Sequence, residues 1–255
     1  MNSIKYSVCS FDELCGCLIP CSGIKRIPKN AKAVIVGIFP YLLPKNEYAG
    51  SVISKYAVVK DYHQVVLGYL DKKKQELMKI YPNDEFACFV DSSPIPEVYA
   101  AALCGLGAIG DNGLLITKEF GSFVFIGEIV TSADIPAQKN TVKQCLHCGK
   151  CIKSCPGNAL GDNAFNKNNC LSHITQKKGE LTNEEKELIK KHKTCWGCDE
   201  CQNVCPLNQN AAVTDIPEFL NFFQRVPDLN EDISDRAFAF RGIKVIERNL
   251  NLIKL

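Results

Sequence analysis

Two stretches decide the fold of the second half of the chain: residues 145–156 read CLHCGKCIKSCP, and residues 195–206 read CWGCDECQNVCP. Both follow the pattern Cys-x2-Cys-x2-Cys-x3-Cys-Pro. Two residues between thiolates make a tight loop that lets three sulfurs reach three irons of one cube, while the cysteine before proline reaches the other cube. The two stretches therefore predict two adjacent 4Fe-4S clusters, each held by sulfurs from both runs.

Spacing alone assigns every thiol of the two runs and leaves Cys170, between the runs, as a buried thiol. Zinc is the alternative metal, since two Cys-x2-Cys knuckles can close a tetrahedral site. Zinc has no use for the third thiol and the Cys-Pro of each run, so the pattern favours iron-sulfur. On spacing, the first cluster is held by Cys145, Cys148, Cys151 and Cys205, and the second by Cys155, Cys195, Cys198 and Cys201.

Composition limits the other classes of function. The 30 Lys and Arg residues nearly balance 28 Asp and Glu, so any nucleic-acid contact must rest on a local patch. Of the 15 cysteines, eight lie in the two metal-type runs. This distribution argues against a disulfide scaffold and for a reducing compartment. The chain has no signal-like start and no apolar stretch long enough to cross a bilayer, so we expect a cytoplasmic monomer without a membrane partner.

The front of the chain, residues 1–140, is expected to form an α+β domain. Residues 33–39 (AVIVGIF) are apolar and rich in β-branched side chains, as in a buried strand, and apolar residues recur at helical spacing over 61–80. Residues 141–210 should form a ferredoxin-like double 4Fe-4S module, followed by a short helical tail over 211–255. Further strands are expected at 86–90 and 121–130, and helices at 96–103, 183–191, 217–224 and 232–253.

Two further patterns, a glycine loop and the cysteines outside the two runs, do not match known ligand-binding motifs. The glycines of residues 105–110 have the spacing Gly-x-Gly-x-x-Gly, but they follow an expected helix, whereas a dinucleotide-binding loop must follow a strand and open a helix. The other cysteines match no common metal loop and are expected to be core thiols. These cysteines are Cys9, Cys15, Cys17, Cys21, Cys88 and Cys104.

Over about residues 11–210 the chain resembles a known family, the cobalamin-dependent epoxyqueuosine reductases that finish queuosine synthesis in transfer RNA. The front of the chain carries the resemblance in RIPKNAKAVIVGIFPY (26–41), SKYAVVKDYH (54–63), VDSSP (90–94), GLGAIGDNGLLI (105–116) and GSFVFIGEI (121–129). The cluster region carries it in CLSHITQKKG (170–179) and GCDECQNVCPLN (197–208). The resemblance implies a cobalamin-binding type of front domain, which we adopt as the expected fold.

The same resemblance implies cofactors, partners and site residues. A 4Fe-4S cluster would feed electrons to the cobalamin, an external donor such as a ferredoxin or flavodoxin would supply them, and transfer RNA would carry the substrate. Cys170 would join Cys155, Cys198 and Cys201 on the second cluster, in place of Cys195. Residues implied near the cobalamin or the active site are Tyr56, Tyr62, His63, Gly105, Gly107 and Gly110.

Asp91 matches the family's catalytic acid. Removing an epoxide oxygen consumes two electrons and two protons, and the oxygen departs more easily when a positioned acid protonates it. From the residues alone, the favoured role of Asp91 is instead the N-cap of the helix that follows Pro94. A structural role is likewise the favoured one for His63 without the resemblance.

The chain departs from the family pattern in two respects. Members commonly have an aromatic residue and a Lys where this chain has Ala108 and Asp111, and fuller members continue into a helical-repeat domain. Two other functions therefore stay open: a ferredoxin-like electron carrier without corrinoid, and a corrinoid reductase of another small substrate, such as a halogenated compound. Candidate RNA contacts are Lys177, Lys178, Lys190, Lys191, Lys193, Arg236, Arg241, Lys244 and Arg248.

Overall fold

The computed structural model describes residues 3–161 and 164–253, which fold into two compact units. The first unit contains Met1–Pro40 and Tyr62–Leu146, and the second contains Tyr41–Asp61 and His147–Leu255. Residues 41–61 thus group with the cluster-binding segment, and the tail belongs to the same unit. The three-part division into 1–140, 141–210 and 211–255 stays a prediction.

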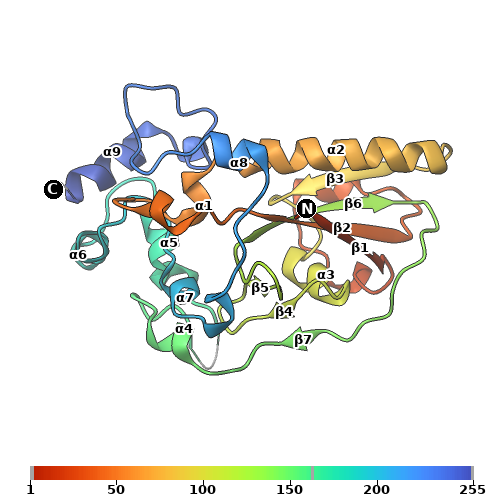
Figure 1. Ribbon diagram of the computed structural model, residues 1–255, viewed down its shortest axis with the longest axis horizontal. Helices are drawn as coiled ribbons and strands as arrows, with labels where there is room; N and C mark the ends of the chain where they lie inside the picture. Colours follow the sequence, from red (N-terminus) through yellow and green to blue (C-terminus); the bar gives the residue numbers. More distant parts are fainter. Residues whose placement is uncertain (1–2, 162–163, 254–255) are drawn as a thin grey trace. The chain divides into compact units, whose positions relative to one another are not determined.

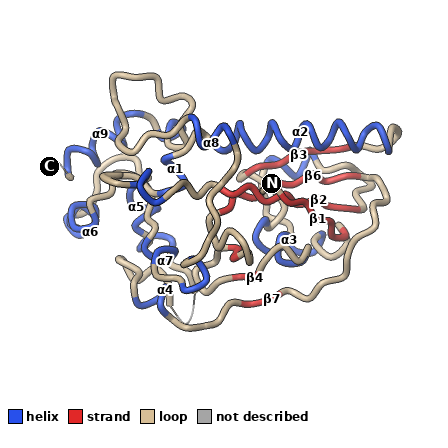
Figure 2. The backbone as a smooth tube through the Cα atoms, viewed as in Figure 1, coloured by secondary structure: helices blue, strands red, loops and turns tan. Residues whose placement is uncertain are grey.

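The first unit is built on a four-stranded sheet in the order β1-β2-β6-β3, in which each neighbouring pair is antiparallel (Figure 1). Its strands, red in Figure 2, are β1 (Lys5–Ser10), β2 (Ala33–Pro40), β3 (Phe86–Val90) and β6 (Val124–Thr131). Every residue of β2 is buried, which explains its continuous apolar sequence. β2, β3 and β6 confirm the predicted strands, whereas β1 was not predicted because its sequence, KYSVCS, is largely polar.

Two helices cover this sheet. α2 (Tyr62–Ile80) packs against β3 and β6, and α3 (Glu97–Leu103) packs against β1, β2 and β6 (Figure 1). A side chain at Gly127 of β6 would lie 2.8 Å from Val66 and 2.9 Å from Leu70, so Gly127 faces α2. Because neighbouring residues of a strand point to opposite faces, Glu128 faces the other way, toward the side of α3.

Smaller elements complete the first unit. A three-stranded sheet has the order β5-β4-β7, with β4 antiparallel to β5 and parallel to β7. Cys9, Cys88 and Cys104 are buried, as predicted, but Cys15 and Cys17 are exposed, and the expectation that they are core thiols is wrong. The 3-10 helix that holds these two cysteines lies on the surface and buries none of its residues. The bounds are β4 (Ala108–Ile109), β5 (Leu115–Ile116), β7 (Lys143–Gln144), η1 (Cys15–Cys17) and η2 (Ser22–Arg26).

The second unit is largely helical. Single β-bridges join Ile53 to Trp196 and Val59 to Phe223, and the buried Trp196 indole donates to the Tyr56 hydroxyl over 2.8 Å. These bonds explain why residues 41–61 belong here. Its helices are α1 (Lys55–Val58), α4 (Lys150–Lys153), α5 (Leu171–Thr175), α6 (Asn183–His192), α7 (Glu200–Asn203), α8 (Pro217–Asn221) and α9 (Ile243–Leu252), with 3-10 turns η3 (Lys45–Tyr48), η4 (Lys167–Asn169), η5 (Pro206–Asn208) and η6 (Ala239–Arg241).

The C-terminal helix α9 is tied to the cluster-binding segment by Asn249. This side chain is wholly buried and donates to the carbonyls of Thr175 (2.7 Å) and Cys195 (2.8 Å). The helix predicted over 232–253 is correct only for α9, because Gly242 just before it has φ +86, which an α-helix cannot include. No helix formed by the described residues is long and apolar enough to cross a membrane.

We expect Gly197→Ala to lower the melting temperature of the second unit strongly. Gly197 has φ +75, and an added Cβ would lie 2.0 Å from the Ser54 hydroxyl oxygen and 2.6 Å from its Cβ. Backbone strain and overpacking together cost about 2–5 kcal/mol. Gly179→Ala is the matched control, since Gly179 has φ +80 but open space around it. Equal thermal shifts of the two variants, measured by circular dichroism, would contradict the expected clash.

Candidate active site and cluster-binding segments

Asp91 lies in a left-handed turn directly after β3. Its φ is +60, which is uncommon for a residue other than glycine. The Asp91 N–H donates to Glu97 Oε1 over 2.8 Å, and the Asp91 carbonyl accepts from the Ser93 N–H over 2.6 Å. The N-cap of α3 is Pro96, without a side-chain cap bond, so the N-cap role favoured for Asp91 from the residues alone is wrong.

The Asp91 carboxylate is paired with His63 of the first turn of α2. His63 Nε2 lies 3.4 Å from Asp91 Oδ2, and the two side chains are 36% and 59% exposed. Tyr62 stacks between His63 and Phe125, with ring centroids 4.0 Å and 4.1 Å away. The hydrogen bond with His63 lowers the pKa of Asp91 below its ordinary value, and Tyr62 adds to this effect. Three residues predicted from the resemblance therefore meet in one exposed group.

Two carboxyl groups behind Asp91 titrate in the opposite direction. Burial and the Asp91 charge raise the pKa of Glu97 to about 8. Glu128 is wholly buried, and burial followed by the charge of Glu97 raises its pKa well above the ordinary value. At neutral pH the exposed Asp91 is therefore charged, whereas both glutamates carry protons. Neighbouring carboxyl groups whose pKa values are shifted in opposite directions are typical of acid-base sites.

Glu97 and Glu128 were missed by the sequence analysis. Glu128 did carry a signal, since it is a single carboxylate inside the apolar strand sequence of residues 121–130. A charge at such a position is rarely fully buried without a special role. Glu97 carried no signal, because a glutamate in the first turn of a helix is ordinary.

The glycine loop lies where it was expected, after α3 and leading into β4. Gly105 has φ +77 and ends α3, with its N–H donating to the Ala102 carbonyl over 2.9 Å. Side chains at Gly107 and Gly110 would lie 2.6 Å from the Ile116 carbonyl oxygen and 2.4 Å from Asn112 Oδ1. Internal packing thus explains these glycines, and their contact with a corrinoid stays a prediction.

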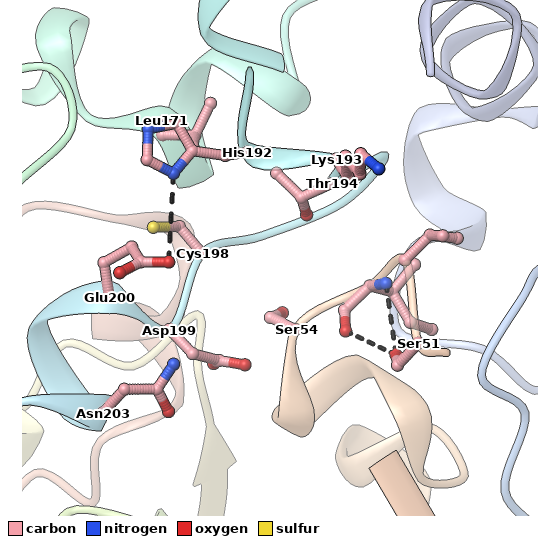
Figure 3. Close-up of a pocket in the computed structure, with 12 residues that line it drawn as sticks. Ser51, Ser54, Leu171, His192, Lys193, Thr194, Cys198, Asp199, Glu200 and Asn203 are labelled. Atoms are coloured by element: carbon pink, nitrogen blue, oxygen red, sulfur yellow. Dashed lines mark hydrogen bonds and ion pairs between the residues drawn. The ribbon is translucent and has the colours of Figure 1, made fainter. Parts of the chain in front are cut away.

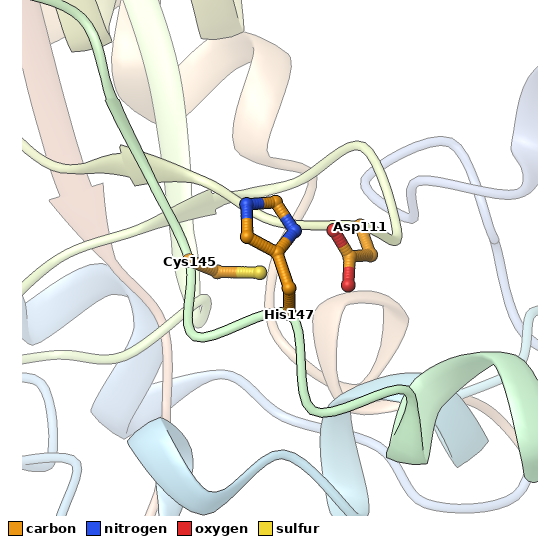
Figure 4. A group of neighbouring side chains, drawn as sticks. All are labelled: Asp111, Cys145 and His147. Carbon is orange, nitrogen blue, oxygen red and sulfur yellow. The ribbon is translucent and has the colours of Figure 1, made fainter.

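Asp111, one of the departures from the family pattern, lies beside a predicted cluster ligand (Figure 4). It follows β4, and Cys145 follows β7, whose neighbour is β4; the Cys145 N–H donates to the Ile109 carbonyl over 3.0 Å. The carboxylate of Asp111 and the sulfur of Cys145 are within 4.8 Å of each other. An anion this close disfavours added negative charge on a cluster held by Cys145.

Cys195 and Cys170, the two candidates for the fourth ligand of the second cluster, have different surroundings. Cys195 is wholly buried, and its N–H donates to the Val52 carbonyl over 2.7 Å. Cys170 is only half-buried. A Cβ at Gly157 would lie 1.9 Å from the Asn169 carbonyl oxygen, so the backbone after Cys155 touches the backbone just before Cys170. This contact favours Cys170, as the resemblance implied.

The donor set of the second unit fits iron-sulfur chemistry. α4 and α7, which carry Cys151 and Cys201, pack against each other. Cys198 lines a polar cavity of about 180 Å³ (Figure 3). His192 lies 3.9 Å from Glu200 at its edge, and Asp199 accepts from the Lys55 N–H over 2.8 Å. The thiols of these two packed helices belong to the Cys-x2-Cys-x2-Cys-x3-Cys-Pro runs, which are the ligand pattern of paired 4Fe-4S clusters.

An α+β unit with an exposed Asp–His pair and two Cys-x2-Cys-x2-Cys-x3-Cys-Pro runs define the class of the chain, which is that of the iron-sulfur proteins. Two family models match it: a 4Fe-4S double cluster binding domain over residues 144–208, and "Epoxyqueuosine reductase QueG, DUF1730" over residues 22–92. The chain therefore contains a double 4Fe-4S cluster-binding domain.

The chain is 35% identical over 223 residues to an epoxyqueuosine reductase of Lactococcus garvieae, covering 81% of this chain and 62% of the relative. It is 34% identical to one of Aliivibrio fischeri, covering 73% of this chain and 52% of the relative. The solved epoxyqueuosine reductase of Streptococcus thermophilus matches with 27% identity and a TM-score of 0.80, over 98% of this chain and 76% of that one. The chain belongs to the epoxyqueuosine reductase family, and the predicted α+β fold with its cluster module is confirmed. It spans only about half to two thirds of the length of these curated relatives.

Proposed function

We propose that the protein reduces epoxyqueuosine in transfer RNA to queuosine. The observation that carries this proposal is the Asp91–His63 pair, held 3.4 Å apart on the surface of a unit whose relatives are epoxyqueuosine reductases. An epoxyqueuosine reductase of the same fold, 24% identical to this chain, has been solved with a tRNA-Tyr stem loop that carries epoxyqueuosine. A cytoplasmic location agrees with this substrate.

In this mechanism Asp91 protonates the departing epoxide oxygen. Its lowered pKa leaves it ionised while it is exposed. Substrate that covers Asp91 removes water from the carboxylate, which raises its pKa and lets it take up the proton that it then donates. His63 stabilises the carboxylate before and after this transfer. The exposed Asp91, the His63 imidazole and the stacked Tyr62 are arranged to act on a substrate that binds at the surface of the first unit.

Cobalamin, when bound, supplies the electrons at the substrate carbon. The polypeptide supplies the route to it: Cys170 and the thiols of the two runs other than Cys195 would hold two 4Fe-4S clusters, which an external ferredoxin or flavodoxin would reduce. Tyr62 and His63 of the first unit are the side chains that we assign to the cobalamin or to the substrate, whereas the role of Tyr56 stays a prediction from the resemblance.

We propose fewer residues as RNA contacts than the sequence alone suggested, because some of them bind other parts of the second unit. Arg248 donates to the carbonyls of Lys177 and Gly179, over 2.9 and 2.6 Å, and so works inside the second unit. Lys190 pairs with Glu187 at 2.7 Å, and Arg236 pairs with Asp235 at 3.2 Å. The residues that we retain as candidate RNA contacts are Lys178, Lys191, Lys193, Arg241 and Lys244.

Anaerobic reconstitution tests the proposal directly. The protein would be loaded with iron, sulfide and cobalamin, reduced, and given a stem-loop RNA that carries epoxyqueuosine. We expect queuosine in the digested product by mass spectrometry. Full iron content without stoichiometric corrinoid uptake would favour a ferredoxin-like carrier instead. Corrinoid uptake without queuosine would favour a reductase of another small substrate, the candidate that Asp111 beside Cys145 supports.

A further inference from the structure

A glutamate side chain from a neighbouring helix binds the backbone of the Asp91 turn. Asp91 has φ +60, a conformation that non-glycine residues keep only when their surroundings enforce it. Its N–H points to Glu97 Oε1 at 2.8 Å. Glu97 is the first residue of α3, and the following part of that helix, Ala100 to Leu103, is buried. The turn is thereby fastened to a rigid element.

We propose that Glu97 is a positioning residue for Asp91: its carboxyl oxygen holds the Asp91 N–H and so keeps the Asp91 side chain beside His63. Without this acceptor the backbone has little reason to stay in the left-handed region, because φ would relax toward the broadly allowed negative values. A relaxed turn redirects the Cα–Cβ bond of Asp91 and carries its carboxylate away from the imidazole. The proposal rests on the proposed function only in its kinetic consequences.

Glu97 does this work without a charge at neutral pH. The titratable groups that face it are Asp91 after β3, His63 of α2 and Glu128 of β6; Cys9 of β1 in turn faces Glu128. Burial and the Asp91 charge raise the pKa of Glu97 to about 8. A protonated carboxyl still accepts through its carbonyl oxygen, so Glu97 can hold the Asp91 N–H while the charge beside His63 is that of Asp91. Glutamine has the same shape and the same acceptor, so it mimics this state.

Three variants separate positioning from general stability. Glu97→Gln keeps the acceptor, Glu97→Ala removes it, and Glu119→Ala removes an exposed glutamate elsewhere in the first unit, which pairs with Lys5. In Glu97→Ala we expect rapid hydrogen exchange of the Asp91 amide and a rise of the Asp91 pKa toward its ordinary value, both read by NMR. Glu97→Gln and Glu119→Ala should keep slow exchange and the lowered pKa.

Kinetics supply the second readout. We expect Glu97→Ala to lower kcat by about tenfold to a hundredfold, the usual consequence of a misplaced catalytic group, whereas Glu97→Gln should stay close to the unmodified protein. Adding Glu97→Ala to Asp91→Asn should lower kcat little beyond the loss that Asp91→Asn causes alone, because Glu97 acts through Asp91. A lowered Asp91 pKa and slow exchange retained in a folded Glu97→Ala would overturn the proposal, as would a Glu97→Gln as impaired as Glu97→Ala. The NMR readouts need no turnover, so failure of the proposed function would leave them decisive.

Discussion

Asp91→Asn is expected to lower queuosine formation by about 10²–10⁴-fold, the usual contribution of a positioned general acid. Asparagine has nearly the same shape and tolerates φ +60. The backbone N–H of residue 91 can still donate to Glu97, so the turn should persist. What the variant loses is the proton that Asp91 takes up when substrate covers it.

Asp84→Asn is the matched control for this change. Asp84 is another carboxylate of the first unit, where it accepts from the Ser132 hydroxyl over 2.8 Å, and it precedes β3 whereas Asp91 follows that strand. Both variants should contain about eight irons per chain, as two 4Fe-4S clusters require. Single-turnover assays under anaerobic conditions measure the chemical step. Equal rates for Asp91→Asn and the unmodified protein would exclude Asp91 as the acid.

Cys170→Ser is expected to lose about half of the iron, because a 4Fe-4S cube needs four thiolates. Cys170 is half-buried and follows Asn169, whose carbonyl touches the backbone at Gly157 just after Cys155. Cys195→Ser should keep both clusters, because the four thiols that we assign to the second cluster are Cys155, Cys170, Cys198 and Cys201, and Cys195 is wholly buried in the core.

Iron and acid-labile sulfide assays on the two serine variants measure this difference, and electron paramagnetic resonance of the reduced proteins shows whether two clusters remain. Cys198→Ser is the positive control, since Cys198 is a ligand in either assignment. Loss of half the iron from Cys195→Ser, with none lost from Cys170→Ser, would reverse the assignment. Each variant also tests the pattern rule, which assigned Cys195 on spacing alone.

Much of the first unit could be predicted because its elements have clear periodicity. The apolar run of β2 and the helical spacing of α2 are properties of short stretches. β1 was not predicted, because this strand is stabilised by pairing with β2 and not by its own composition. The long helix predicted near the C-terminus failed at Gly242, where a positive φ overrides the pattern of apolar residues.

Some residues of the candidate site could likewise be predicted from the sequence, and others could not. The two clusters could be predicted from cysteine spacing, because the reach of thiolates to a cube depends on a spacing of two or three residues. The sequence also pointed to Asp91 and His63 through family motifs. The three-dimensional contacts were needed to show that Asp91 is no helix cap and that Glu97 and Glu128 lie behind it. They were also needed to show that Cys195 is wholly buried whereas Cys170 is only half-buried. Burial, pKa and backbone strain arise from residues far apart in the chain, so no local pattern can encode them.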